Sequence, residues 1–193
     1  SIVFPSNVDE IVRIVRSTDL PLSIGGGHFS MGGTTASPGS IHIDMRKMNR
    51  VLAFNPEARL IRVQAGIRWC DVQRFVDPHG MAVKIMQTYA NFTVGGSLSV
   101  NAHGRYMGLG PIVLSVKSIR IVLANGETVD ASRSENFDLF RTAIGGYGAI
   151  GIITEAELEL VPNTRLKRDR EKLALKHYTP WFDKNVRGQS DIV

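Results

Sequence analysis

The sequence is poor in the residues that cross-link small proteins or bind metals. Cys70 is its only cysteine, so no internal disulfide can form, which fits a reducing compartment. We expect Cys70 to be a buried small apolar residue rather than a reactive thiol, because no His or Lys stands beside it to favour the thiolate. No pair or triad of His, Cys, Asp and Glu has metal-ligand spacing, so we expect no metal site.

Long hydrophobic runs are also missing, and we therefore expect no membrane span and a cytoplasmic protein. No GxSxG elbow or other hydrolase nucleophile motif is present. The chain begins with Ser1 rather than Met and enters folded structure at once, so we expect a trimmed chain and leave its native targeting open.

The net charge is +5, which by itself could indicate a nucleic-acid partner. The positive excess is concentrated late in the chain, where Asp169 and Glu171 interrupt it, and this pattern is typical of a solvated face. Its members are Arg165, Lys167, Arg168, Arg170 and Lys172. We predict no nucleic-acid partner, and part of the remaining positive charge could offset the phosphates of a cofactor.

The hydrophobic pattern predicts a chain of mixed helices and strands. Helices are expected at 8–15, capped by Ser6 or Asn7, and at 68–76 and 136–144. Strands are expected at 20–24, 41–44, 51–54, 60–64, 116–124, 128–131 and 150–161. The turn at 55–58 and the pair Asn125-Gly126 predict two antiparallel hairpins.

This order of elements predicts an α+β fold with two subdomains. Residues 1–53 form a small α/β lobe, and residues 54–163 form a mixed lobe with an antiparallel sheet. The segment 164–193 lacks a companion core, so we interpret it as the start of a truncated substrate or cap domain.

Several of the nineteen glycines occur in four tight groups, each at the edge of a predicted strand or helix. The groups are 25–27, 32–33, 95–96 and the set Gly145, Gly146, Gly148 and Gly151. Glycine lets a ligand approach the backbone, and consecutive N–H groups bind phosphate oxygens well. Each group alone could be only a tight turn. All four together, beside His28 and His103, indicate a nucleotide site.

A Rossmann dinucleotide site is one alternative, because a glycine-rich loop follows the strand at 20–24 and Asp44 ends the next strand about twenty residues later. That site needs a helix directly after the loop. The chain instead continues as HFSMGGTTASPGS, with Pro38 and no apolar helical stripe. We therefore predict a different nucleotide-binding fold.

Three motifs resemble the vanillyl-alcohol oxidase / p-cresol methylhydroxylase (PCMH) flavoprotein superfamily. The stretch PLSIGGGHFSMGGTTASPGSIHIDMRKMNRVL is similar to its first flavin loop, and FTVGGSLSVNAHGR to its second. AIGGYGAIGIITEAELELVPN is similar to the strand that closes around the adenine half of FAD. The motifs follow the family's order over about residues 3–163. The resemblance implies a PCMH-type fold that holds extended FAD between two subdomains, with a separate cap domain for substrate.

The resemblance also implies which residues contact FAD. Around the pyrophosphate and toward the isoalloxazine it places Ile24, Gly25, Gly26, Gly27, His28, Phe29, Ser30, Gly32 and Gly33. Along the pyrophosphate and the ring it places Thr93, Gly95, Gly96, Ser97, Ser99, Asn101, His103 and Gly104. Near the adenine it places Gly148 and Ile153.

His28 is the candidate for covalent flavin attachment, because the matching histidine of GGGH-type loops is bonded to the C8 methyl group of the flavin. This chain departs from the pattern by inserting Phe29 before Ser30. Alignment on SMGG would put Phe29 at the linkage position, and Phe cannot form the bond. A non-covalent contact and a structural role for His28 therefore stay open. His103 could face the ring or the phosphates, or could be hydrogen-bonded within its own loop.

The resemblance implies an FAD-dependent oxidase or dehydrogenase that oxidises a small alcohol, sugar or polyol, or lactone by hydride transfer to the flavin. No residue here is a convincing catalytic base, so we expect that base in the missing domain. One alternative is an NADPH-dependent reductase of the enolpyruvyl-UDP-N-acetylglucosamine reductase type. Another is a binding module of the same fold that has lost its cofactor.

Overall fold

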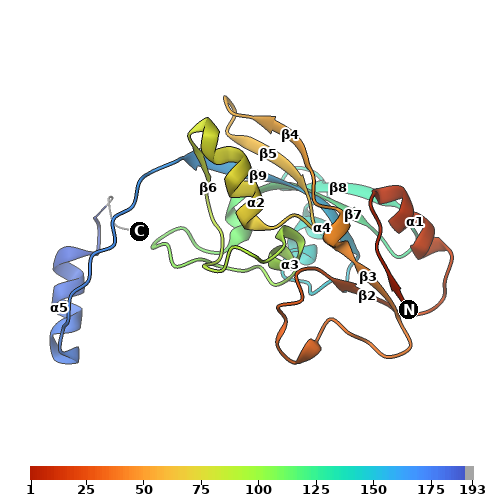
Figure 1. The fold of residues 1–193 in the computed structure, drawn as a ribbon, viewed down its shortest axis with the longest axis horizontal. Helices are drawn as coiled ribbons and strands as arrows, with labels where there is room; N and C mark the ends of the chain where they lie inside the picture. The colour runs from red at the N-terminus through yellow and green to blue at the C-terminus, as the bar shows by residue number, and fades with distance from the viewer. Residues whose placement is uncertain (190–193) are drawn as a thin grey trace.

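The computed structural model describes residues 1–189, which form two β-sheets and five α-helices (Figure 1). The first sheet is parallel, with strand order β1-β3-β2. Its strands are β1 (Ile2–Val3), β2 (Leu22–Gly25) and β3 (Ile41–Asp44). The register pairs Gly25 with Asp44, so the carboxyl ends of β2 and β3 lie together.

The second sheet is antiparallel, with order β4-β5-β9-β7-β8, and β6 pairs with the end of β9. Its strands are β4 (Val51–Asn55), β5 (Leu60–Gln64), β6 (Met81–Val83), β7 (Val116–Val122), β8 (Thr128–Ser132) and β9 (Ile152–Pro162). Both predicted hairpins are present, as β4-β5 and β7-β8. The α+β class expected from the sequence is confirmed.

The helices are α1 (Val8–Arg16), α2 (Trp69–Val76), α3 (Val94–Ser99), α4 (Phe137–Ala143) and α5 (Leu175–Asn185). Asn7 rather than Ser6 caps α1, because its side chain accepts the Glu10 N–H at 2.9 Å. The sequence pattern missed β1, β6 and α3. The first two are only two and three residues long, and α3 is built largely from glycine and serine, which favour helices weakly.

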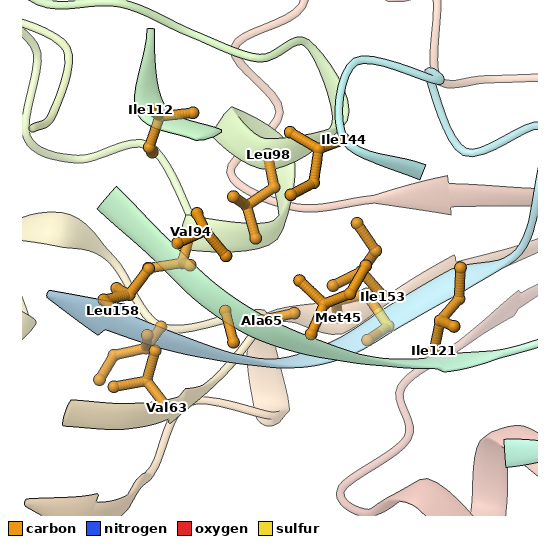
Figure 2. Packing of buried hydrophobic residues seen from close by; sticks show 14 of the residues in the cluster. Met45, Val63, Ala65, Val94, Leu98, Ile112, Ile121, Ile144, Ile153 and Leu158 are labelled. Atoms are coloured by element: carbon orange, nitrogen blue, oxygen red, sulfur yellow. The ribbon is translucent and has the colours of Figure 1, made fainter. Parts of the chain in front are cut away.

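One hydrophobic core joins the two sheets. Figure 2 shows Met45, from just after β3, beside Ile153 of β9, in the same buried cluster as Ala65 and Val94. The predicted subdomain boundary at residue 53 falls inside β4, which belongs to the second sheet. The division into two subdomains therefore stays a prediction. The shared core contains residues from both predicted subdomains.

After β9 the chain leaves both sheets and ends in α5, which projects away from the rest of the molecule (Figure 1). None of the residues of α5 is buried, and Leu175 is 89% exposed. The interpretation of residues 164–193 as the start of another domain stays a prediction. Residues 190–193 lie outside the described residues. Across residues 1–189, no helix has both the length and the apolar character needed to cross a membrane.

Candidate functional site

A cleft of about 720 Å³ is lined by all three segments that the sequence singled out. It lies against the loop after β2, against α3, and against the turn between α4 and β9. This volume is within the range of about 300–1,000 Å³ that small-molecule and cofactor sites occupy. The shared core brings together segments that are far apart in sequence.

The loop after β2 presents unused hydrogen-bond donors to the cleft. The N–H groups from Gly26 to Ser30 donate to no acceptor within residues 1–189. Gly26 and Gly27 are half-buried, and residues 28–30 are exposed. Successive N–H groups that line a concavity favour an anion such as a phosphate. This loop therefore fits the pyrophosphate of a dinucleotide.

The N–H groups at the start of α3 already have acceptors within the protein, so a phosphate contact through the glycines of this segment stays a prediction. Val94 N–H donates to the Ile67 carbonyl at 2.8 Å, and Gly95 N–H donates to the Ala65 carbonyl at 2.7 Å. Gly96 N–H donates to the Thr93 side-chain oxygen at 3.3 Å. Glycine is needed at 95 for packing, because a Cβ there would lie 2.8 Å from the Cβ of Ala65.

The turn before β9 carries an exposed aromatic residue that sequence reasoning missed. Tyr147 lines the cleft, is 79% exposed and has a left-handed φ of 54°. Its N–H donates to the Ser99 carbonyl at 2.9 Å, which ties this turn to α3. A strained non-glycine residue at a ligand cleft is a common feature of binding sites. The signal in the sequence was an aromatic residue inside a glycine cluster.

Most of the predicted contact residues line the cleft, and five do not. Those that do are Ile24, Gly25, Gly26, Gly27, His28, Phe29, Ser30, Thr93, Gly95, Gly96, Ser97, Ser99, Gly148 and Ile153. Those that do not are Gly32, Gly33, Asn101, His103 and Gly104. The lining residues that the sequence analysis missed include Met45, Ala65, Phe92, Val100 and Tyr147, of which four are ordinary apolar residues with no local signal.

The residues outside the cleft have contacts within the protein. Asn101 accepts the Val113 N–H through its side chain at 3.2 Å. One ring nitrogen of His103, Nδ1, lies 2.9 Å from the Gly104 carbonyl oxygen, which is the loop-internal contact that the sequence left open. Gly32 has a φ of 69° in a tight turn, so glycine there serves the backbone.

The His28 side chain contacts the buried carboxylate of Asp44. Its Nε2 lies 3.1 Å from Oδ2 of Asp44, whose side chain is 2% exposed. Arg46 donates to the same carboxylate from Nη2 at 2.6 Å and from Nε at 2.9 Å. Burial raises the pKa of Asp44, but the hydrogen bonds from Arg46 and His28 outweigh it and lower the pKa to about 2. Asp44 is therefore an ionised acceptor at neutral pH.

Phe29 turns toward a small aromatic cluster. Its ring centroid lies 5.1 Å from those of Tyr89 and Phe92, while His28 turns toward Asp44.

Cys70 is half-buried rather than fully buried, and its thiol donates to the Asn91 side-chain oxygen at 3.3 Å. In the described part of the chain, no group of three His, Cys, Asp or Glu residues is placed to hold a metal ion.

The fold and the cleft together define a nucleotide-binding domain with a mixed α+β architecture. A family model described as an FAD binding domain matches residues 1–132. The chain belongs to this family, within the PCMH-type superfamily of FAD-linked oxidases, and the cofactor of the family is FAD. The free N–H groups of the first loop and the volume of the cleft fit that cofactor.

Three relatives illustrate the similarity. A proposed D-arabinono-1,4-lactone oxidase of Neurospora crassa is 30% identical over 193 residues, which is 98% of this chain and 34% of the relative. Cytokinin dehydrogenase 7 of Oryza sativa subsp. japonica is 32% identical over 82% of this chain and 32% of its own. L-Gulonolactone oxidase of Mus musculus is 28% identical over 93% of this chain and 41% of its own. The chain thus spans about a third to two fifths of these relatives.

Proposed function

We propose that this chain is the FAD-binding part of an FAD-dependent oxidoreductase that oxidises a lactone. The relatives include lactone oxidases, which supports a lactone among the alcohol, sugar or polyol, and lactone substrates that the sequence allowed. The short span of the match supports a longer enzyme whose other part binds the substrate.

The observation that carries the cofactor assignment is the row of free donors from Gly26 to Ser30. We assign the pyrophosphate to these N–H groups, because they are five successive donors that line the cleft and have no protein acceptor within residues 1–189. The turn around Tyr147 and Gly148 also lines the cleft, with Gly148 close to Ile24, and would contact the cofactor there. Ile153, at 9% exposure, forms part of the apolar floor.

FAD, when bound, supplies the acceptor for a hydride from a substrate carbon that bears a hydroxyl group. The chain's residues hold and orient that cofactor and keep water from its apolar face. His28 and Tyr147 are the titratable side chains that line the cleft among residues 1–189. His28 has Asp44 as a hydrogen-bond partner, but we assign this pair to the cofactor, and we assign the base for the substrate hydroxyl to the substrate-binding part of the enzyme.

The test is an anaerobic flavin-reduction screen on the longer enzyme that contains this chain. Aldonolactones should bleach the flavin absorption, whereas polyols and free sugars should bleach it more slowly. NADPH-driven bleaching would instead favour the reductase of enolpyruvyl-UDP-N-acetylglucosamine. Purified protein without visible absorption, even after incubation with FAD, would favour a binding module that has lost its cofactor.

A further inference from the structure

His28, in the first loop, has a left-handed backbone conformation that is strained for a residue other than glycine. His28 has a φ of 58°, a region that costs a non-glycine residue about 1–2 kcal/mol, and three glycines precede it that could have taken this conformation. The strained residue is instead a histidine that lines the cleft, with its side chain 41% exposed. The strain therefore accompanies a specific placement of the imidazole ring.

That placement is set by the strand next to the loop. Gly25 pairs with Asp44, so the loop leaves β2 beside the end of β3, where the Asp44 carboxylate stands. Arg46 holds this carboxylate with two side-chain donors and its own backbone N–H at 3.1 Å. The carboxylate cannot rotate away without losing these bonds, so it presents Oδ2 to His28 in one direction.

The contact also decides which ring nitrogen of His28 carries hydrogen. An ionised carboxylate only accepts hydrogen bonds, so the Nε2 that lies 3.1 Å from Oδ2 must be the protonated nitrogen. Nδ1 then bears the lone pair in the neutral ring. It has no hydrogen-bond partner within the described residues.

We propose that Asp44 is a positioning residue that fixes the tautomer and orientation of His28, so that Nδ1 is available to the FAD in the cleft. This role rests on the proposed function, since it requires FAD in that cleft. If the contact between His28 and Asp44 is purely structural, it only holds the loop in place. FAD affinity would then not depend on which ring nitrogen of His28 carries the hydrogen.

The first arm of the test needs no cofactor. Imidazole ¹⁵N shifts of the full chain should show a protonated Nε2 and an unprotonated Nδ1 in the neutral ring of His28, assigned by loss of the signals in His28→Gln. In Asp44→Asn the amide can also donate, so the two tautomers should mix. The chain has five histidines, which keeps the assignment tractable. Unchanged ring shifts in Asp44→Asn would overturn the role.

The second arm is a double-mutant cycle on the dissociation constant for the initial, non-covalent binding of FAD to the cofactor-free chain. Asp44→Asn should weaken FAD binding roughly tenfold in the wild-type chain, and hardly at all in the His28→Gln chain, because coupled residues share one effect. Arg46→Met is the matched control, since it removes the other partner of Asp44 and should give a smaller loss. Equal losses in both backgrounds would overturn the proposal.

Two further outcomes separate the possible failures. If Asp44→Asn does not fold, Asp44→Glu keeps the charge but displaces the carboxylate, and the same cycle with it should again give coupling to His28. If the wild-type chain binds no FAD while the ring shifts respond to Asp44, the proposed function fails together with the role toward FAD. Tautomer control without coupling, in a chain that binds FAD, overturns the positioning role alone.

Discussion

Gly26 illustrates why glycine is required in the first loop at the scale of one residue. The backbone at Gly26 is not left-handed, so conformational freedom is not the reason for glycine at this position. A Cβ at this position would lie 2.2 Å from the Thr93 side-chain oxygen. The constraint is close packing between the first loop and the start of α3, beneath the cleft.

We expect Gly26→Val to destabilise the chain by about 1–3 kcal/mol through overpacking. The loss of FAD binding free energy should be larger than this loss of stability, because the displaced loop also carries the free N–H groups. Urea unfolding of the cofactor-free chain and FAD titration measure the two effects. Gly32→Ala is the matched control, since its Cβ meets nothing within 4 Å and only the φ of 69° is strained. Equal losses in stability and affinity for Gly26→Val would favour a simple tight turn.

His28 is expected to stay attached to the flavin, through a bond from a ring nitrogen to the C8 methyl carbon. This bond would replace a C–H bond, with the proton lost and the two electrons taken up by the flavin itself, which an electron acceptor such as dioxygen would reoxidise. Asp44 occupies Nε2, so the bond would form at Nδ1. Trypsin should release one peptide of residues 17–46, because the flanking cleavage sites are Arg16 and Arg46. After acid precipitation, the mass of this peptide should include one FAD, and His28→Ala should lack it. Yellow colour that leaves entirely with the supernatant would assign His28 a non-covalent role.

Asp44 should make the stability of the fold depend on pH in the acid range. Its pKa is lowered from 3.8 to about 2 in the folded chain, so its ionised form stabilises the fold above pH 3.8. This contribution, about 2 kcal/mol, should be lost as the pH falls from 3.8 toward 2. Urea unfolding between pH 6 and pH 2.5 measures it. Asp44→Asn should remove that part of the pH dependence, and an unchanged acid limb would contradict the assignment.

At the scale of elements, α3 is a helix that tertiary contacts assemble from poor helix formers. Thr93 caps it, and the Val94 and Gly95 N–H groups bond to carbonyls of the segment after β5. Val94 and Leu98 are fully buried against the sheet. Burial and external hydrogen bonds therefore replace helix propensity.

Thr93→Val keeps the shape of the side chain but removes the oxygen that accepts the Gly96 N–H. We expect the free energy of unfolding to fall by about 1 kcal/mol, as for other helix caps. Thr93→Ser, which retains the oxygen, should fall by less. Chemical denaturation of both variants measures the difference. A Thr93→Val chain as stable as the wild type would mean that the two carbonyl contacts suffice to start the helix.

At the scale of the whole molecule, the cleft is lined both by the first loop and by the turn at Tyr147, which lies more than a hundred residues later in the chain. The third sequence motif, which contains this turn, is similar to the segment that closes around the adenine half of FAD, and the family of the chain binds FAD. We therefore expect the chain to bind FAD in preference to FMN. Release of the native cofactor, by acid or by proteolysis where it is bonded to His28, followed by chromatography and mass measurement tests this, and FMN alone would refute it.

Tyr147→Ala provides a matched variant for that comparison. Tyr147 is 79% exposed in the cleft, and its backbone contact to Ser99 does not need the ring. If the ring contacts the adenine half, the variant should lose affinity for FAD and keep its weak affinity for FMN. Equal losses for both cofactors would place the ring against the isoalloxazine.

The sequence by itself determined the α+β class, the two hairpins and the three glycine segments, because these features depend on local properties. Alternation along β9, the Asn125-Gly126 turn and the capped stripe of α1 each act within a few neighbouring residues. The FAD-binding family could be inferred from the same three segments in their order along the chain.

Only the tertiary structure decided which glycines face a ligand and which serve packing. Gly95 and Gly26 are glycine because another segment lies against them, and no local pattern carries that information. The pairing of His28 with Asp44 depends on the register between β2 and β3, and the exclusion of His103 from the cleft depends on its loop-internal contact. Contacts of this kind form between distant residues, so they are settled only when the shared core packs the two sheets together.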